Sequence, residues 1–198
     1  MIAEAVPRSA LADYGDRFAA LSAASRGDLS VRELPFLSQI NLRADPNNAD
    51  LMGRLTVALG FSLPVLPNTT ASGDRHRALW LGPDEWLVVS PDGRKEAVER
   101  ALRNGLNGAF GSIVDVSANR TMLEIRGAGA TALLAHGVSI DLDTRSFAPN
   151  RCAQTMLAKA QVIIDRRSEA AFHVHVRTSF ADYVAAWLLD ASMDTRSI

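Results

Sequence analysis

The pattern of apolar and polar residues predicts alternating strands and helices from residue 31 onward. Residues 34–44 alternate as a strand does, and residues 47–60 have the apolar spacing of a helix that begins at an asparagine and ends at Gly60. A second amphipathic helix is predicted over residues 92–106. Its inward positions are Ala97, Val98, Ala101 and Leu102.

Residues 77–91, RALWLGPDEWLVVSP, read as two strands joined by a tight turn. Pro83 suits the second position of a four-residue turn because its φ is already fixed, and Asp84 is common at the third position. A four-residue turn places Leu81 opposite Trp86. One face then carries Leu79, Leu81, Trp86 and Val88, and the other carries Ala78, Trp80, Leu87 and Val89. Because both faces are apolar, one needs helices and the other needs another sheet, the other half of the chain or a partner protein.

A similar order of elements begins again after residue 108. The expected elements are one long strand or a hairpin over 112–127, a helix over 128–137, a strand pair or long bent strand over 152–166, a strand over 171–177, and a final helix over 179–192 capped by Ser179.

The repeated order predicts an α+β fold made of two related β-α-β-β-α units with antiparallel sheets and helices on one side. The first unit is expected over residues 31–108 and the second over 109–198, together forming one compact domain. Residues 1–30 are expected to form an arm with a short helix, spaced on Leu11, Tyr14, Phe18 and Leu21, outside the main core.

Composition favours a globular protein without a charged partner surface. The 198 residues are 47% hydrophobic, and 21 Lys and Arg nearly balance 22 Asp and Glu, so we expect neither nucleic acid nor a membrane as a partner. Cys152 is the one cysteine, which indicates a reducing compartment, and the N-terminal stretch lacks an apolar core typical of a signal peptide. We therefore expect a cytoplasmic location.

Four groups of residues carry the types used in catalysis or metal binding, but none forms a specific motif. Asp84 and Glu85 are adjacent on a turn, and the spacing favours solvation over paired acid/base work. His173 and His175 share one face of a strand and could supply two metal ligands, although no third ligand is evident.

Cys152 stands beside Arg151, which could activate a thiolate, yet a lone cysteine at the start of a strand is more often a packed residue. Asp115, Ser117 and His136 have the residue types of a hydrolase triad without a nucleophile elbow. No catalytic, cofactor-binding or metal-binding residue is therefore assigned.

Several stretches together resemble one family, the gamma subunit of heterotetrameric sarcosine oxidase, over roughly residues 30 to 192. They are ALWLGPDEWLVV, DVSANRTMLEIRGAGATALLAHGVSIDL, FAPNRCAQTMLAKAQVII and RTSFADYVAAWLLDA. The resemblance implies a fold similar to the folate-dependent aminomethyltransferase of the glycine cleavage system.

The resemblance also implies partners and a reaction. The complex contains alpha, beta and delta subunits besides gamma, and it oxidises sarcosine to glycine with hydrogen peroxide and a one-carbon unit passed to tetrahydrofolate. FAD, FMN, NAD and the tetrahydrofolate site belong to the alpha and beta subunits, zinc belongs to delta, and the gamma chain carries no cofactor.

The chain departs in two places from the families that it resembles. The transferases have His-Met-Gly where this chain has Ala118, Asn119 and Arg120, and the segment that supplies their catalytic aspartate has no clear counterpart. Asn150 stands where the gamma family has glycine, but asparagine tolerates a left-handed turn.

Three hypotheses follow from the sequence. The first is a non-catalytic subunit whose hairpin and 145–155 segment dock on larger subunits, with interface residues Trp80, Asp84, Glu85, Trp86, Arg120, Arg145 and Arg151. The second is a free-standing folate-dependent one-carbon transferase in which Asp115 or Glu124 contacts the pterin ring. The third is a regulatory module that self-associates through the apolar hairpin face.

Overall fold

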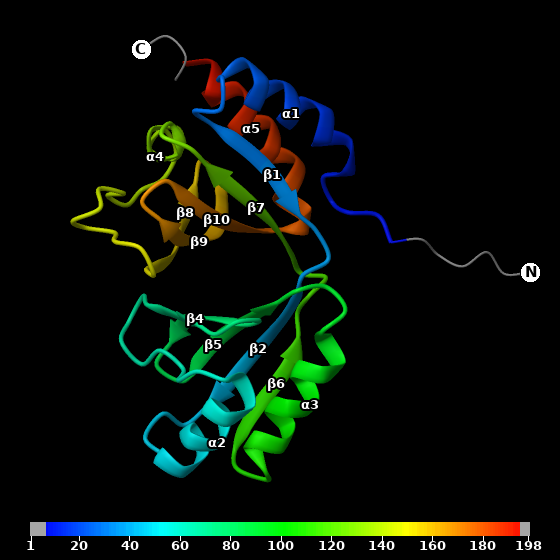
Figure 1. Cartoon of the computed structure of the whole chain (residues 1–198), viewed down its shortest axis with the longest axis vertical. Helices are drawn as coiled ribbons and strands as arrows, with labels where there is room; N and C mark the ends of the chain where they lie inside the picture. Colours follow the sequence, from blue (N-terminus) through cyan, green and yellow to red (C-terminus); the bar gives the residue numbers. More distant parts are fainter. Residues whose placement is uncertain (1–6, 195–198) are drawn as a thin grey trace, which may run out of the picture.

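The computed structural model describes residues 7–194 and contains two five-stranded antiparallel sheets (Figure 1). Sheet A has the order β1-β7-β10-β9-β8, with bounds Ser30–Leu34, Arg120–Arg126, Ala171–Arg177, Ala160–Ser168 and Cys152–Leu157. Sheet B has the order β3-β4-β5-β2-β6, with bounds Thr70–Ser72, Arg77–Gly82, Glu85–Ser90, Ser38–Ala44 and Gly111–Asp115.

Helices cover one side of each sheet (Figure 1). Those of sheet A are α1 (Gly15–Ala24), α4 (Ala130–Ala135) and α5 (Ala181–Asp194), and those of sheet B are α2 (Ala49–Leu59) and α3 (Lys95–Leu106). Short 3₁₀ turns, Ala12–Tyr14 and Thr178–Phe180, precede α1 and α5. Ser179 therefore lies within the turn before α5, which begins at Ala181.

The predicted α+β class with two related antiparallel units is confirmed, and each unit has one more strand than expected. The first runs β2-α2-β3-β4-β5-α3 and the second β7-α4-β8-β9-β10-α5. The pattern missed β3 because this strand has only three residues. The stretch 152–166 is a strand pair, β8 and β9, one of the two alternatives predicted.

The two halves exchange an edge strand, so their boundaries differ from those predicted. β1 lies in sheet A, beside β7, and the next strand along the chain, β2, lies in sheet B. β6 lies in sheet B beside β2, and the chain then returns to sheet A as β7. Sheet A thus combines residues 7–34 with 120–194, and sheet B is built from residues 38–115.

This exchange also changes two predicted elements. Residues 34–44 were expected to form one strand, and the strand observed there is β2, with Leu34 belonging to β1 of the other sheet. Residues 112–127 form neither one long strand nor a hairpin, because β6 lies in sheet B and β7 in sheet A. Phe36, with φ of 58°, breaks the first segment, and residues 116–119 break the second.

The N-terminal helix belongs to the core of sheet A, and the expectation of an arm outside the core is wrong for residues 7–30. Tyr14, Phe18 and Leu21 are all buried in the same cluster as the sheet A strands. The Tyr14 hydroxyl also donates to Asp182 Oδ1 on α5 at 2.7 Å. Residues 1–6 of the predicted arm lie outside the described residues.

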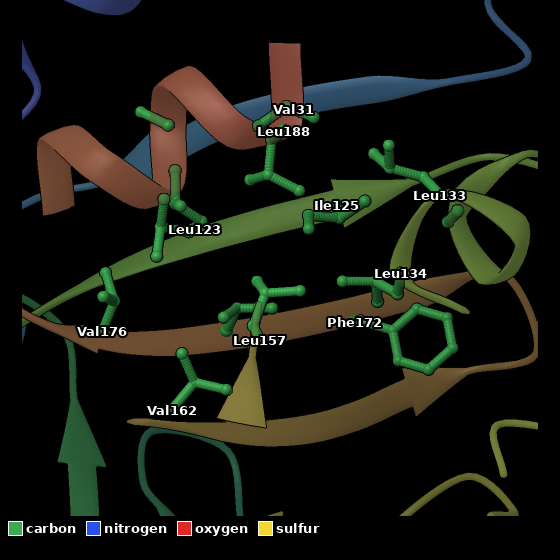
Figure 2. Close-up of a cluster of buried hydrophobic side chains, with 14 of the residues drawn as sticks. Val31, Leu123, Ile125, Leu133, Leu134, Leu157, Val162, Phe172, Val176 and Leu188 are labelled. Atoms are coloured by element: carbon green, nitrogen blue, oxygen red, sulfur yellow. The ribbon is translucent and has the colours of Figure 1, made fainter. Parts of the chain in front are cut away.

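The main core of sheet A lies between its strands and its helices (Figure 2). Leu123 and Ile125 of β7 and Phe172 of β10 point toward Leu188 of α5 and Leu134 of α4. Each large side chain buried in this way contributes about 2 kcal/mol. The opposite side chains of the same strands face sheet B.

The sheet B core forms under α2 and α3. As predicted, α2 starts with an asparagine cap, in which Asn48 Oδ1 accepts from the Leu51 amide at 3.0 Å, and it ends at left-handed Gly60. In α3, Val98 and Leu102 are buried as expected. Ala97 is exposed instead of inward-facing, and Leu106 takes part in the buried stripe.

The β4–β5 hairpin turns at Pro83 and Asp84 as predicted, but its pairing is shifted by one residue. Gly82 pairs with Glu85, and an irregularity before Gly82 then pairs Trp80 with Trp86 and Leu79 with Leu87. A β-bulge adds one residue to one strand and reverses the facing of every residue beyond it. Trp80 and Trp86 consequently share the face toward the helices, and Leu79 and Leu87 share the face toward sheet A.

We expect Phe18→Ala to lower the free energy of unfolding by about 3–5 kcal/mol, because it leaves a cavity between α1 and sheet A. Urea unfolding followed by circular dichroism measures this change. The exposed neighbour supplies a control: Ala19→Ser should stay within about 0.5 kcal/mol of the unchanged chain. Equal stability of the two variants would show that the helix is a dispensable arm.

Candidate functional site

The inner faces of the two sheets meet through a small apolar cluster. It contains Leu79 and Leu87 from the hairpin and Cys152 and Ile163 from sheet A, all nearly inaccessible to water. The sequence left open whether another sheet, the other half of the chain or a partner protein covers the second face of the hairpin. In the structure sheet A covers it. Self-association is not needed to cover Leu79 and Leu87.

A buried ion pair joins the sheets beside this cluster. Arg77 of β4 donates from Nε to Asp165 Oδ2 at 2.7 Å and from Nη2 to Asp165 Oδ1 at 2.6 Å. Arg77 is 7% exposed and Asp165 1% exposed. This two-bond geometry is the strongest form of an arginine–carboxylate contact.

Asn150 completes the joint between the sheets. Its backbone is left-handed, with φ of 64°, a conformation that asparagine tolerates. Its side-chain Oδ1 accepts from Arg77 Nη1 at 3.3 Å, and its carbonyl accepts from the Thr70 amide at 2.9 Å. Glycine could hold the same turn but could not contact Arg77.

Polar side chains cross the inner face of sheet A in one register row. Paired residues along the five strands are Arg32, Glu124, His173, Asp165 and Cys152. Arg32 Nε contacts Glu124 Oε2 at 2.5 Å. Burial opposes ionisation of Glu124, but the hydrogen bond from Arg32 holds the pKa of Glu124 below its usual value.

His173 and His175 share the inner face, as their spacing predicted. His173 Nε2 lies 3.5 Å from Glu124 Oε1, and burial followed by the charge of Arg167 lowers the pKa of His173. Burial lowers the pKa of His175 to about 3, so its ring is neutral at physiological pH. Between residues 7 and 194, no three His, Cys, Asp or Glu side chains gather where they could hold a metal ion.

Cys152 is a packed residue in this structure. Burial, followed by the negative charge of Asp165, raises the pKa of the Cys152 thiol to about 12. The nearby cations Arg77 and Arg151 lower it by less. A thiol in this environment stays protonated, whereas a nucleophile needs a thiolate.

The other groups with catalytic residue types are not assembled into an active site. Asp115 Oδ1 accepts from the Ser117 hydroxyl at 2.6 Å, and Asp115 Oδ2 lies 3.1 Å from Lys95 Nζ. His136 lies at the end of α4, in the helix layer of the other sheet. The carboxylates that the transferase hypothesis assigned to the pterin ring, Asp115 and Glu124, are thus paired with Lys95 and Arg32.

Two of the predicted interface residues form part of the hairpin tip. Arg43 Nη2 lies 3.5 Å from Asp84 Oδ1 and 3.1 Å from Glu85 Oε2, and Asn41 Nδ2 donates to Glu85 Oε1 at 2.7 Å. These contacts place Asp84 and Glu85 in a partly exposed polar group.

The three predicted arginines lie in the other half of the chain. Arg120 lines a cavity of about 370 Å³ with Arg177, and burial followed by the charge of Arg177 lowers the pKa of Arg120. Arg145 is exposed, and its Nε lies 2.9 Å from Asp143 Oδ1. Arg151 is half-buried just before β8.

The tryptophans are core residues to different degrees. Trp86 is 0% exposed and donates from Nε1 to the Pro64 carbonyl at 2.7 Å, so the prediction that Trp86 contacts a partner is wrong. The bulge at the hairpin turned its side chain toward α2 and α3. Trp80 packs at the margin of the same cluster, and its buried Nε1 has no hydrogen-bond partner within the described part of the chain.

The sequence analysis did not predict that Arg77, Asp165 and Asn150 form a connected group. Two of them carried a signal: Arg77 and Asp165 stand at the ends of the apolar runs ALWL and VII, so their side chains are expected near the interior. Nothing in the two runs indicates that they pair, because 88 residues separate the partners.

Among residues 7–194, no helix is both long and apolar enough to cross a membrane.

Comparison with known proteins identifies close relatives along most of the chain. A family model described as "Sarcosine oxidase, gamma subunit family" matches residues 43–194. The sarcosine oxidase subunit gamma of Arthrobacter sp is 37% identical over 172 residues, which are 86% of this chain and 83% of that protein.

Solved structures extend the match to the fold. A chain of the heterotetrameric sarcosine oxidase from Corynebacterium sp. U-96, solved with pyrrole 2-carboxylate, has a TM-score of 0.87 and 31% identity and covers 96% of each chain. Aminomethyltransferase T of Bartonella henselae has a TM-score of 0.63 at 15% identity, and the match covers 86% of this chain and 48% of that one. The second likeness confirms the fold that the resemblance implied.

We expect Asp165→Asn to lower the free energy of unfolding by about 3–5 kcal/mol, because it leaves Arg77 charged and unpaired between the sheets. The double variant R77M/D165L should lose less than the single variant, since no buried charge then remains. Urea unfolding measures both, and Arg103→Met on the exposed face of α3 serves as an unaffected control. A double variant less stable than the single one would contradict this account.

We expect Cys152 to resist alkylation in the folded chain. Because its pKa is raised to about 12, the fraction of Cys152 in the thiolate form at about pH 8 is roughly a thousandfold smaller than that of a free cysteine. The thiol is also buried, so a reagent cannot reach it. Mass spectrometry after iodoacetamide treatment should show labelling only in denaturant. Rapid labelling under native conditions would restore Cys152 as a candidate nucleophile.

Proposed function

The chain belongs to the sarcosine oxidase gamma subunit family, and we propose that it acts as the non-catalytic gamma subunit of a heterotetrameric sarcosine oxidase. The observation that carries this proposal is the match of 96% of the chain to 96% of a chain from such a complex, at a TM-score of 0.87. A relative of 37% identity with the same subunit name supports it.

A structural role fits the way in which this chain uses its interior charges. Arg77 is paired with Asp165, and Arg32 is paired with Glu124, each at hydrogen-bond distance. The Arg77–Asp165 pair joins the two sheets, whereas the Arg32–Glu124 pair joins β1 to β7 within sheet A. Carboxylates held in this way are not poised to transfer protons. We therefore assign the contribution of this chain to assembly.

The chemistry of the complex is assigned to the other subunits. In this proposal, alpha, beta and delta subunits accompany the chain in the cytoplasm, with FAD, FMN, NAD and tetrahydrofolate held by alpha and beta and zinc held by delta. The complex then oxidises sarcosine to glycine and hydrogen peroxide and passes the one-carbon unit to tetrahydrofolate.

We place the main docking surface at the tip of the hairpin. Asp84 lines an open hollow of about 740 Å³ with Pro83, Pro46 and Phe110. Phe110 is 96% exposed, and an aromatic side chain in water gains about 2 kcal/mol when a partner covers it. Asp84 and Arg43 supply polar contacts around this aromatic centre, an arrangement typical of interfaces.

The remaining predicted interface residues extend this proposal to sheet A. Arg145 is exposed, Arg120 and Arg151 are half-buried, and Trp80 and Glu85 are half-buried near the hairpin tip. We retain these five as secondary contacts with the larger subunits.

Co-expression with the partner subunits tests the proposal. A tag on this chain should recover a yellow complex whose flavin absorption is bleached by sarcosine. A colourless chain recovered alone would refute the subunit role, and tetrahydrofolate binding by that lone chain would favour the transferase hypothesis instead.

We expect Phe110→Ala to weaken assembly by roughly tenfold, because it removes the aromatic centre of the proposed docking surface. The measure is the ratio of flavin absorbance to tagged chain after purification at low subunit concentration. Val57→Ala, which truncates an 85% exposed side chain in the last turn of α2, is the matched control. Equal flavin recovery for both variants would move the docking surface elsewhere.

A further inference from the structure

A second cavity, of about 280 Å³, opens between the two sheets, and we name it the His175 cavity. Its walls come from the β3–β4 turn, the end of β5, and the inner faces of β9 and β10. A water needs only about 15 Å³ of such space, so the His175 cavity has room for a small organic molecule. Its position away from the Phe110 hollow separates it from the proposed docking surface.

His175 lines this cavity with an unsatisfied ring. It is 1% exposed, and neither ring nitrogen has a hydrogen-bond partner within the part of the chain that the structure describes. An unsatisfied buried polar atom is unfavourable, because it has lost its hydrogen bonds to water without gaining others. A neutral imidazole presents one donor and one acceptor, so it is satisfied by a group that both accepts and donates, such as a hydroxyl or an amide.

Arginines give the cavity an excess of positive charge. Three of them, Arg75, Arg77 and Arg167, line it together with two aspartates, Asp74 and Asp165. Both oxygens of Asp165 are already held by Arg77, and Arg167 Nη1 reaches the same carboxylate only at 3.4 Å. Arg75 lies in the exposed β3–β4 turn, so of the two arginines on the strand walls, Arg77 and Arg167, the charge of Arg167 is the less fully paired.

Burial and the neighbouring Arg77 lower the pKa of Arg167. His173 lies in the same wall, and the charge of Arg167 contributes to the lowered pKa of His173. His76, at the mouth, is already bonded through Nδ1 to the Ser90 hydroxyl at 2.8 Å. An anion near Arg167 would offset repulsion felt by both Arg167 and His173.

The remaining walls are apolar and limit the class of ligand. Leu34, Leu79, Val89 and Met122 surround the polar groups. A single excess positive charge matches a monocarboxylate better than a doubly charged phosphate, and the planar guanidinium binds a carboxylate through two parallel bonds. The ligand must also reach His175 with a neutral polar group.

We propose that the His175 cavity binds a small monocarboxylate that also carries an amide or hydroxyl group, with the carboxylate on Arg167 and the neutral group on His175. This site goes beyond the assembly role and does not depend on it.

The test uses the purified full chain and N-acetylglycine as the probe, followed by NMR of the histidine ring resonances. We expect saturable shifts of His173 and His175 with a Kd of about 1 mM or tighter. Acetamide, which lacks the charge, and inorganic phosphate, which lacks the apolar body, should bind at least about tenfold more weakly. Absence of saturable shifts, or equal binding of acetamide or phosphate, would overturn the proposal.

Variants assign the contact to Arg167. Arg167→Met should weaken N-acetylglycine binding at least about tenfold, and it is chosen because the Arg167 side chain is 34% exposed, which lets the variant keep the core. Thermal unfolding verifies that the fold is retained. Arg100→Met on the exposed face of α3 is the matched control, and unchanged binding in Arg167→Met would also overturn the proposal.

Discussion

A buried pair of opposite charges, Arg77 and Asp165, lies at the centre of the contact between the two halves of this protein. The apolar contact between the sheets is small, with four fully buried residues, so hydrophobic burial alone does not define how the sheets meet. The bidentate pair, reinforced by Asn150 and Thr70, gives that contact one geometry. The neighbouring charged row of sheet A, the cavity beside it and the covered face of the hairpin all depend on the sheets being held in this position.

The parts of the fold that were predictable are those determined by neighbours in sequence. Asn48 and Gly60 mark the ends of α2 by local chemistry, and Pro83 marks the hairpin turn. The parts that failed depend on distant partners. Nothing near residues 34–44 indicates that β1 pairs with β7, and the bulge that turns Trp86 inward is not visible in the alternation of a run that is apolar on both faces.

The same limit applies to the sites. His173 and His175 were placed correctly on one face, because strand alternation is local, but the cavity in front of them is formed by a turn nearly a hundred residues away in the chain. Asp84, Arg145 and Arg120 remain surface or cavity residues, as an interface would require. Phe110 carries a signal that was present in the sequence, an aromatic residue between glycines after a helix, yet its exposure is known only from the fold.

The exchange of edge strands determines the order in which the chain can fold as it is synthesised. All strands of sheet B lie within residues 38–115, so sheet B can close while the rest of the chain is still being made. β1 precedes all of them but must wait for β7, since Arg32 and its partner Glu124 are 92 residues apart. Contacts over such distances form slowly. The N-terminal strand and helix thus spend translation with their apolar faces uncovered, and this interval is when the nascent chain is most open to chaperones.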